Sequence, residues 1–226
     1  FYMPNTDQSA WEFTPGMVNS ITELGYTYEE IFPTEVHPLF SSIGKRLRRI
    51  GLPLEEIEKF SIMKKKLNAE LVGASSTSLF IGAIRTSTDL KLENKAWNKV
   101  KKNFNKFRAM KSFDELSESE VPDEMFLQLE GVRGKEDSIV CAVSVNQKYV
   151  GHVSLFGLRN ATAKDEAHGG GGLTIKLDIT KVVDELHLSN TEDVSNFDVL
   201  IQPVNMVTEG NELTIDRISI YRKTSE

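Results

Sequence analysis

The sequence is poor in the residues that build covalent or metal-stapled folds. Cys141 is the only cysteine among 226 residues, which excludes a disulfide within the chain and a zinc site made of several cysteines. The four histidines are scattered, so we expect no preformed metal cluster. His168 is only a weak candidate for a metal ligand. No apolar run approaches the roughly 18 residues that a membrane helix requires, and we expect no membrane partner.

Basic residues are missing from the start of the chain. Residues 1–44 hold no Lys or Arg and six acids, whereas residues 45–111 hold 17 basic and 6 acidic residues, and residues 112–226 hold 10 basic and 21 acidic residues. The net charge of −6 therefore conceals a middle segment of +11. Such asymmetry indicates segments with different roles, and we expect the basic segment to pack on acidic neighbours of this protein rather than on nucleic acid.

Residues 1–34 combine aromatic residues with proline, and a short helix between Thr14 and Gly25 fits their capping preferences. This segment is too short to build a core of its own, so we expect it to be the end of a larger domain. The chain starts at Phe1 without a signal-peptide pattern, and we interpret it as a fragment or a processed product.

The middle of the chain indicates helices. One helix is expected after Pro53, and a second over 95–110 has an apolar face of Trp97, Val100, Phe104 and Phe107. We predict a helical basic connector and acidic linker over residues 35–123, ending in the acidic stretch before Pro122.

Residues 124–226 change to a period of two. Apolar residues recur at every second position around 125–129, 139–145, 173–179 and 197–201, which is typical of antiparallel strands with one buried face. A turn is expected at Asn146–Lys148, a short helix at 181–188 capped by Thr180, and a bulge near Asp216. The fold class that follows is α+β, mainly an antiparallel β-sandwich preceded by the connector and the aromatic end-piece.

Two stretches resemble a known family. Trp11-Glu12-Phe13-Thr14, followed by Leu24-Gly25-Tyr26-Thr27-Tyr28, resembles the end of the catalytic domain of tyrosinases and polyphenol oxidases, which are type 3 copper proteins. The stretch from Lys148 to Phe156 and the closing run from Leu213 to Ile220 resemble the C-terminal domain of these enzymes. The resemblance implies a proenzyme that oxidises phenols and catechols to quinones with two coppers and O₂, and melanin-type pigments are typical products of such chemistry.

The resemblance also implies a role for this region. In that family the C-terminal domain covers the dicopper site and keeps the enzyme latent, and a side chain from one of its loops occupies the pocket. Phe156 is the first candidate for this plug and Leu158 the second, whereas Trp11, Tyr26 and Tyr28 would be structural. The partner would be the catalytic domain of the same protein.

Copper itself should be bound elsewhere in that parent. The family binds each copper through three histidines, several of them one helical turn apart, and no His-x-x-x-His occurs here. We therefore expect no catalytic residues and no copper ligands in this chain. Where some relatives carry a cysteine pair, this sequence has Asp165-Glu166-Ala167-His168.

Two other functions remain open on the sequence. The first is a stand-alone β-sandwich module that binds a sugar or a protein and carries a helical docking arm. The second is a basic amphipathic arm that binds anionic partners. Phe156 could also be a core residue of a strand, and Cys141 is expected to be a buried, inert thiol.

Overall fold

The computed structural model describes residues 2–4, 10–12, 42–58, 68–109, 122–164, 169–189 and 196–224. The chain divides into two units, residues 1–37 and 38–226. In the first unit, β1 (Tyr2–Pro4) pairs antiparallel with β2 (Ala10–Glu12), and Met3 lies opposite Trp11. The helix expected between Thr14 and Gly25 lies outside the described residues.

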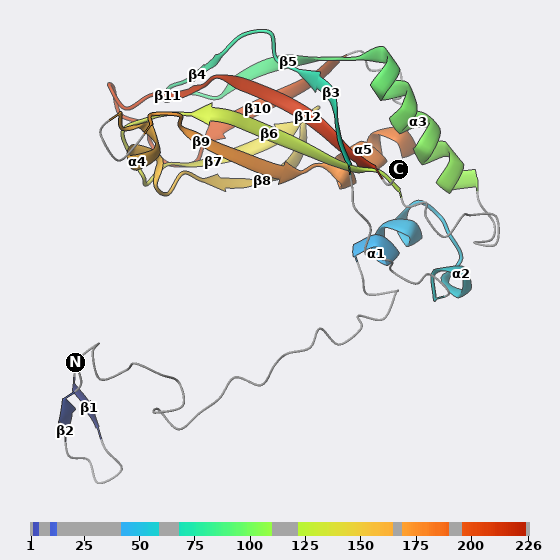
Figure 1. Ribbon diagram of the computed structural model, residues 1–226, viewed down its shortest axis with the longest axis horizontal. Helices are drawn as coiled ribbons and strands as arrows, with labels where there is room; N and C mark the ends of the chain where they lie inside the picture. The colour runs from blue at the N-terminus through green and yellow to red at the C-terminus, as the bar shows by residue number, and fades with distance from the viewer. Residues whose placement is uncertain are drawn as a thin grey trace. The chain divides into compact units, whose positions relative to one another are not determined.

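The second unit is built on one eight-stranded antiparallel sheet. Its strands follow the order β8-β7-β10-β5-β3-β12-β6-β9 (Figure 1). Their bounds are β3 (Asn68–Ala74), β5 (Thr86–Leu92), β6 (Glu124–Val132), β7 (Val140–Val145), β8 (Lys148–Ser154), β9 (Leu173–Asp178), β10 (Asn196–Pro203) and β12 (Arg217–Thr224). A small sheet pairs β4 (Leu79–Ile81) with β11 (Leu213–Ile215).

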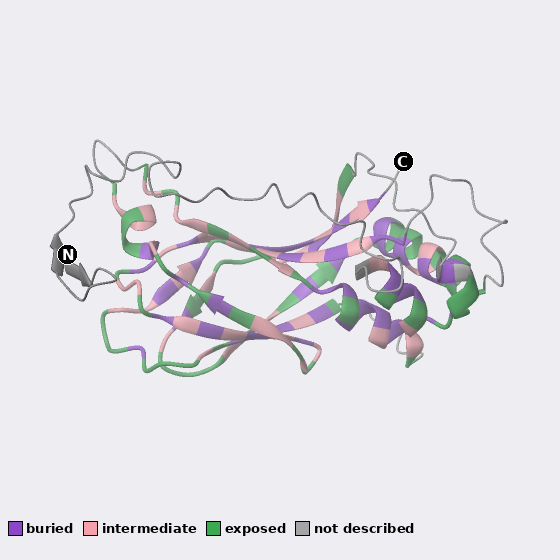
Figure 2. Cartoon of the chain, turned by 90° about the horizontal axis from the view of Figure 1, so that it is seen from below, coloured by how far each residue is buried: buried purple, intermediate pink, exposed green. Residues whose placement is uncertain are grey.

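The large sheet curls until its two edge strands, β8 and β9, contact each other. Buried and exposed residues alternate along the strands, as Figure 2 shows. The inward positions, such as Phe197, Val199 and Ile201 of β10, form one continuous hydrophobic core. The mainly antiparallel β structure is confirmed, but a single curled sheet encloses the core where the sequence suggested a sandwich of two sheets.

The predicted helical connector is wrong for residues 68–92. These residues form β3, β4 and β5, and β3 and β5 lie in the middle of the sheet between β12 and β10. At Gly73 a Cβ would come within 2.7 Å of the carbonyl oxygen of Lys91, so only glycine permits the close pairing of β3 with β5. The β domain, which the sequence suggested to begin at residue 124, therefore takes two of its central strands from the segment expected to be the connector.

Four helices gather at one end of the sheet, which we call the helix end, and one lies at the opposite loop end (Figure 1). The helix end carries α1 (Ser42–Arg49), α2 (Leu54–Glu58), α3 (Asn94–Ala109) and α5 (Thr180–Leu188), and the loop end carries α4 (Leu158–Thr162). None of the described helices is both long and apolar enough to cross a membrane.

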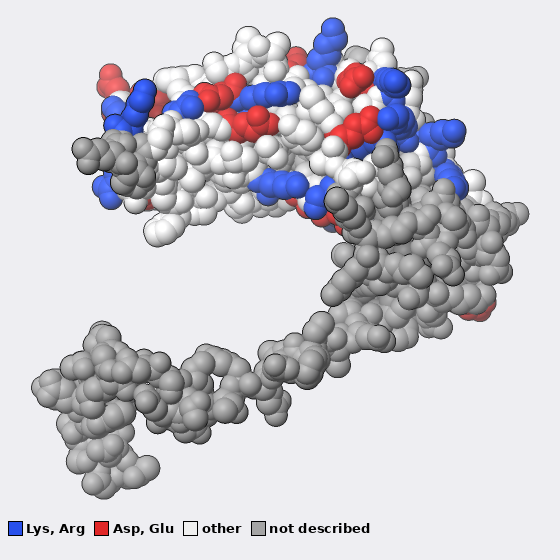
Figure 3. Space-filling model, viewed as in Figure 1, with Lys and Arg blue, Asp and Glu red and all other residues white. Residues whose placement is uncertain are grey.

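The helix expected over 95–110 is confirmed as α3. Its predicted apolar face is buried, and Phe104 and Phe107 join a second cluster with side chains of α1, α2 and the turn between them. Figure 3 shows Lys and Arg side chains gathered over α3, on the face that points to solvent. One of them, Lys99, forms an ion pair with Glu70 at 2.7 Å. Both partners of this pair belong to the basic segment, whereas Arg46 and Arg49 of that segment form ion pairs with Asp184 of the acidic segment.

Local expectations in the second half of the sheet are largely confirmed. Asn146 and Gln147 have φ of 48° and 65°, which gives the tight turn between β7 and β8. The last predicted strand breaks at Asp216 into β11 and β12, which pair with different partners. Thr180 is the first residue of α5 instead of its cap, and its hydroxyl accepts a hydrogen bond from the backbone N–H of Met125.

Candidate functional site

The loop end exposes large apolar side chains that we call the apolar rim. Its members are Phe80, Ile84, Phe156, Val204 and Met206, with exposed fractions between 56% and 86%. Most of the rim comes from neighbouring strands of the sheet. Thr86 of β5 pairs with Ile201 of β10, so the loop that carries Ile84 lies beside the end of β10. Phe80 belongs to β4 of the small sheet. Several large apolar side chains exposed at one end of a domain are typical of an interaction surface.

Phe156 is the most prominent ring of this rim. Its side chain is 85% exposed, although its neighbours Leu155 and Leu158 are 2% and 0% exposed. The interpretation of Phe156 as a core residue of a strand is therefore wrong, because the residue follows the end of β8 in a turn. The two leucines anchor the turn in the core and leave the ring between them in solvent.

Backbone hydrogen bonds fix the turn around Phe156. The N–H of Leu155 donates to the carbonyl oxygen of Ile139 at 3.1 Å, and the N–H of Leu158 donates to that of Leu155 at 3.0 Å. Gly157 has a φ of 81°, in the left-handed region that favours glycine, and α4 begins at the next residue. The turn thus holds Phe156 by its backbone without using its ring.

The helix after this turn is tied to the rest of the sheet. The backbone N–H of Arg159 donates to Asp137 Oδ1 at 2.8 Å, and the hydroxyl of Thr162 accepts from the backbone N–H of Gly134 at 3.0 Å. At Gly134 a Cβ would come within 2.8 Å of Leu158 Cδ2, so a larger residue there would push against this buried leucine. These contacts fix the turn that carries Phe156 before any partner binds.

The loop after β10 carries two more residues of the rim, Val204 and Met206. The N–H of Val204 donates to the carbonyl oxygen of Val140 at 2.8 Å, and the side-chain amide of Asn205 donates to that of Ser138 at 3.1 Å. Because Val140 also pairs with Ser154 of β8, the loops holding Phe156 and Met206 flank the same end of β7. The sequence did not predict the exposure of Phe80, Ile84, Val204 and Met206. A single apolar residue near a turn gives no local sign of whether it is exposed or buried in the core.

The remaining predicted residues lie in different places. Leu158 is fully buried in the main core, so only Phe156 of the two plug candidates presents its side chain to solvent. Trp11 lies in β2, in the first unit. Tyr26, Tyr28 and His168 lie outside the described residues. Cys141 is buried on β7, and burial raises the pKa of its thiol to about 11, which suits an inert thiol.

The described residues do not fit a dicopper site. They include two histidines, His152 and His187, where the family implied by the resemblance uses three for each copper. His152 Nδ1 lies 2.8 Å from the hydroxyl of Tyr149, whereas His187 Nδ1 lies 2.8 Å from the carbonyl oxygen of Val183 inside the helix end. Among the described residues no three His, Cys, Asp or Glu side chains are grouped as metal ligands would be.

Comparison with known families decides the assignment of the chain. The family described as "Domain of unknown function (DUF7868)" matches residues 68–223. The chain belongs to the DUF7868 family. The match begins with the first residue of β3 and ends one residue before the end of β12, so the DUF7868 domain contains the whole eight-stranded sheet. No curated protein matches the sequence.

Several solved structures are similar to parts of the chain. Latent apple tyrosinase is 16% identical over 64% of this chain and 27% of its own, with a TM-score of 0.35. A latent aurone synthase, a polyphenol oxidase, is 14% identical over 65% of this chain and 26% of its own, with a TM-score of 0.37. The C-terminal CBM6 of the laminarinase LamC from Zobellia galactanivorans is 9% identical over 68% and 98%, with a TM-score of 0.30.

These structural similarities are weak. All three TM-scores are below 0.5, so none of them establishes a common fold with the DUF7868 domain. The chain also spans only about a quarter of the length of the two oxidase chains.

Proposed function

We propose that the DUF7868 domain is a shielding domain that keeps a tyrosinase-like enzyme latent by inserting Phe156 into its substrate pocket. The observation that carries the proposal is the 85% exposure of Phe156 on a fixed turn. It coincides with the sequence resemblance from Lys148 to Phe156. The activity of the parent would be oxidation of phenols and catechols, and its copper would be bound outside the described residues.

The energetics of an exposed, preorganised ring favour this role. Burying a phenylalanine side chain in a partner contributes about 1.5–3 kcal/mol. The turn is already fixed by buried leucines and backbone hydrogen bonds, so little conformational entropy is lost on docking. A phenyl ring also has the size and flat shape of a phenol, so a pocket that stacks on phenols accepts it.

The rest of the apolar rim supports docking around the ring. Val204 and Met206, in the loop after β10, would lie beside Phe156 and help to exclude water from the contact, as side chains around a dominant interface residue usually do. The contact would have to be reversible, because a proenzyme becomes active when the plug leaves. The modest number of rim side chains fits such a contact.

The test is phenol oxidation by the copper-loaded parent protein carrying Phe156→Ala. We expect the latent protein to gain activity by about tenfold, because losing the ring removes roughly 1.4 kcal/mol or more of the closed state's advantage. Leu54→Ala is the matched control, since Leu54 is also exposed but lies on α2 at the helix end. An unchanged latent activity in Phe156→Ala, or an equal gain in Leu54→Ala, would contradict the proposal.

A further inference from the structure

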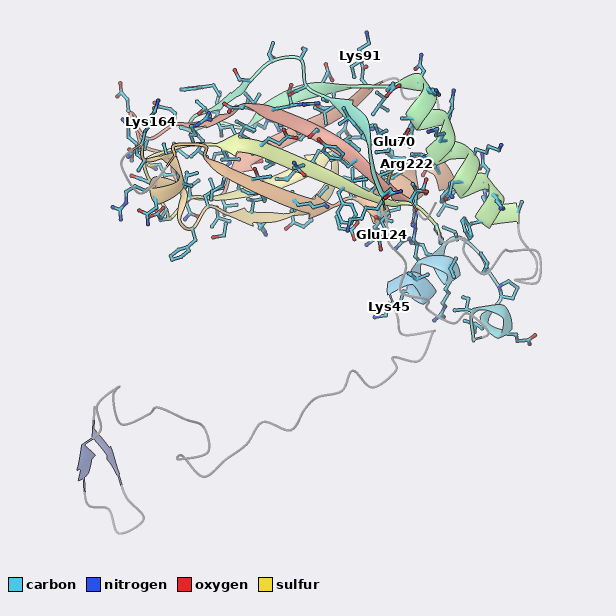
Figure 4. All side chains as sticks on the ribbon, in the orientation of Figure 1. Lys45, Glu70, Lys91, Glu124, Lys164 and Arg222 are labelled. Carbon is cyan, nitrogen blue, oxygen red and sulfur yellow. The ribbon has the colours of Figure 1, made fainter. Side chains whose placement is uncertain are left out.

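A hollow of about 370 Å³ opens at the helix end, far along the sheet from Phe156. It lies beneath α1, at the seam where the edge strands β8 and β9 meet, and the first turn of α5 forms part of its wall. Its lining residues are Ile43, Lys45, Arg46, Arg49, Pro122, Glu124, Tyr149, Val150, Asp178, Thr180, Lys181 and Val182. Figure 4 labels Lys45 on α1 and Glu124 at the start of β6, on two different walls of this region.

Two arginines of the wall share one carboxylate. Arg46 donates from Nε and Nη2 to the two oxygens of Asp184, each at 3.0 Å, and Arg49 Nη2 donates to Asp184 Oδ2 at 2.5 Å. Asp184 is fully buried, so it neutralises one of the two guanidinium charges and leaves the other. Arg49 Nε is itself buried and has no hydrogen-bond acceptor among the described residues.

The other charges of the hollow do not cancel this excess. Lys45 and Lys181 add two positive charges, and Glu124 and Asp178 add two negative ones. Asp178 is already engaged, because its Oδ1 accepts the backbone N–H of Thr180 at 2.8 Å. Lys181 also lies 4.0 Å from Glu185, which bonds Lys148 at 3.0 Å. With Asp184, Glu185 and Lys148 counted, five cations face four carboxylates, which leaves one positive charge in excess.

The start of α5 reinforces the preference for an anion. The N–H groups of Lys181 and Val182 belong to the first turn of this nine-residue helix, where no acceptor inside the helix is available. Both residues line the hollow, and the positive end of the helix dipole favours negative charge there. The helix terminus and the surplus guanidinium thus point to the same type of ligand.

The rest of the wall is apolar. Ile43, Pro122, Val150 and Val182 line the hollow together with the ring of Tyr149. An inorganic ion would leave this surface without contacts, whereas a carboxylate attached to a flat or aliphatic body would cover it. We infer that the hollow is a binding site for a small organic carboxylate, whose charged group lies at the α1–α5 wall and whose apolar body lies against β8.

Benzoate is a suitable probe, and it is added to the full 226-residue chain in a calorimetric titration at low salt. We expect benzoate to bind at least tenfold more tightly than benzamide, its neutral analogue, and this difference should shrink as salt is added. Lys45→Gln combined with Lys181→Gln should weaken benzoate about tenfold. Lys164→Gln is the matched control, because Lys164 is an exposed lysine at the loop end (Figure 4).

Three results would overturn the inference. The first is equal affinity for benzoate and benzamide, and the second is the same loss of affinity in Lys164→Gln as in the double variant. The third is the absence of benzoate-induced amide shifts in the NMR signals of Lys181 and Val182. Because Lys45 and Lys181 are exposed, the double variant should fold, and its far-UV circular dichroism and melting temperature verify this. The site does not depend on the proposed shielding role, and Phe156→Ala should bind benzoate unchanged.

Discussion

Arg222 illustrates how the same neighbour leaves two carboxylates with opposite pKa shifts. Its guanidinium donates to Asp123 Oδ2 at 2.8 Å and to Glu70 Oε2 at 2.8 Å. Burial raises the pKa of Asp123 although Arg222 acts against it, since Asp123 is only 2% exposed. Hydrogen bonds from Lys99 and Arg222 lower the pKa of Glu70, which keeps more contact with water.

The lowered pKa of Glu70 has a consequence for acid stability. A depressed pKa in the folded state stabilises the protein above the ordinary value of 4.5 and loses this effect as the pH falls through the folded pKa. Glu70→Gln should therefore unfold more easily than the wild type at pH 7, and the difference should shrink as the pH falls below 4.5 and through the lowered pKa of Glu70. Urea unfolding at a series of pH values measures this.

A control separates this ion pair from general acid effects. Glu209→Gln changes an exposed acid in the loop between β10 and β11 and should leave the shape of the stability curve unchanged. A constant difference between Glu70→Gln and the wild type at all pH values would mean that the charge of Glu70 is not what stabilises Arg222.

Among the elements, α1 is held to the sheet through a buried charge. Asp184 of α5 bonds Arg46 and Arg49 of α1, and Leu47 adds a buried apolar contact to the second cluster. Removing one partner of a buried ion pair leaves an uncompensated charge and typically costs 3–5 kcal/mol. Asp184 is therefore the position on which the attachment of α1 depends most.

Asp184→Ala should lower the free energy that holds α1 against the rest of the unit by about 3–5 kcal/mol. Native-state hydrogen exchange is expected to show faster exchange in α1 than in β10, whose amides report on the sheet. The double change Arg46→Met with Asp184→Leu replaces part of the charge group by apolar contacts and should recover much of the loss. Uniform destabilisation of β10 and α1 would contradict a local attachment.

At the same scale, the sequence predicted elements with a strong pattern and missed those without one. The face of α3 follows from Trp97 and Phe104 at helical spacing, and the β7–β8 turn follows from Asn146 and Gln147. By contrast, β5 reads Thr-Ser-Thr-Asp-Leu-Lys-Leu, and only Leu90 and Leu92 are buried. Such a polar strand is stabilised by pairing with β10 and β3, which a local pattern does not encode.

For the molecule as a whole, the β-rich class could be predicted but the boundary could not. The long-range pairing of β3 and β12 joins Asn68 to Thr224, and no local signal marks residues so far apart as neighbours. The candidate site was predicted in part, because Phe156 came from a resemblance. The other rim residues were missed, since exposure of an apolar residue depends on the complete fold.

The sugar-binding alternative stays a prediction. Lys176 and Lys223 lie over the ring of Phe126, at 4.3 and 4.7 Å from its centroid, so that ring is covered, whereas Phe80 and Phe156 are exposed. A binding role for the basic segment stays a prediction. Its central part, β3 and β5, is built into the sheet and is therefore unavailable as a free arm.

The central claim is tested most directly by removing the proposed shielding unit from the copper-loaded parent protein. The cut belongs after residue 37, where the two units divide, because a cut at residue 123 would split the sheet. The account predicts that the shortened enzyme oxidises a catechol at least tenfold faster than the latent form. Adding back residues 38–226 should restore latency, and Phe156→Ala in that unit should not. Equal oxidation rates with and without the unit would contradict the account.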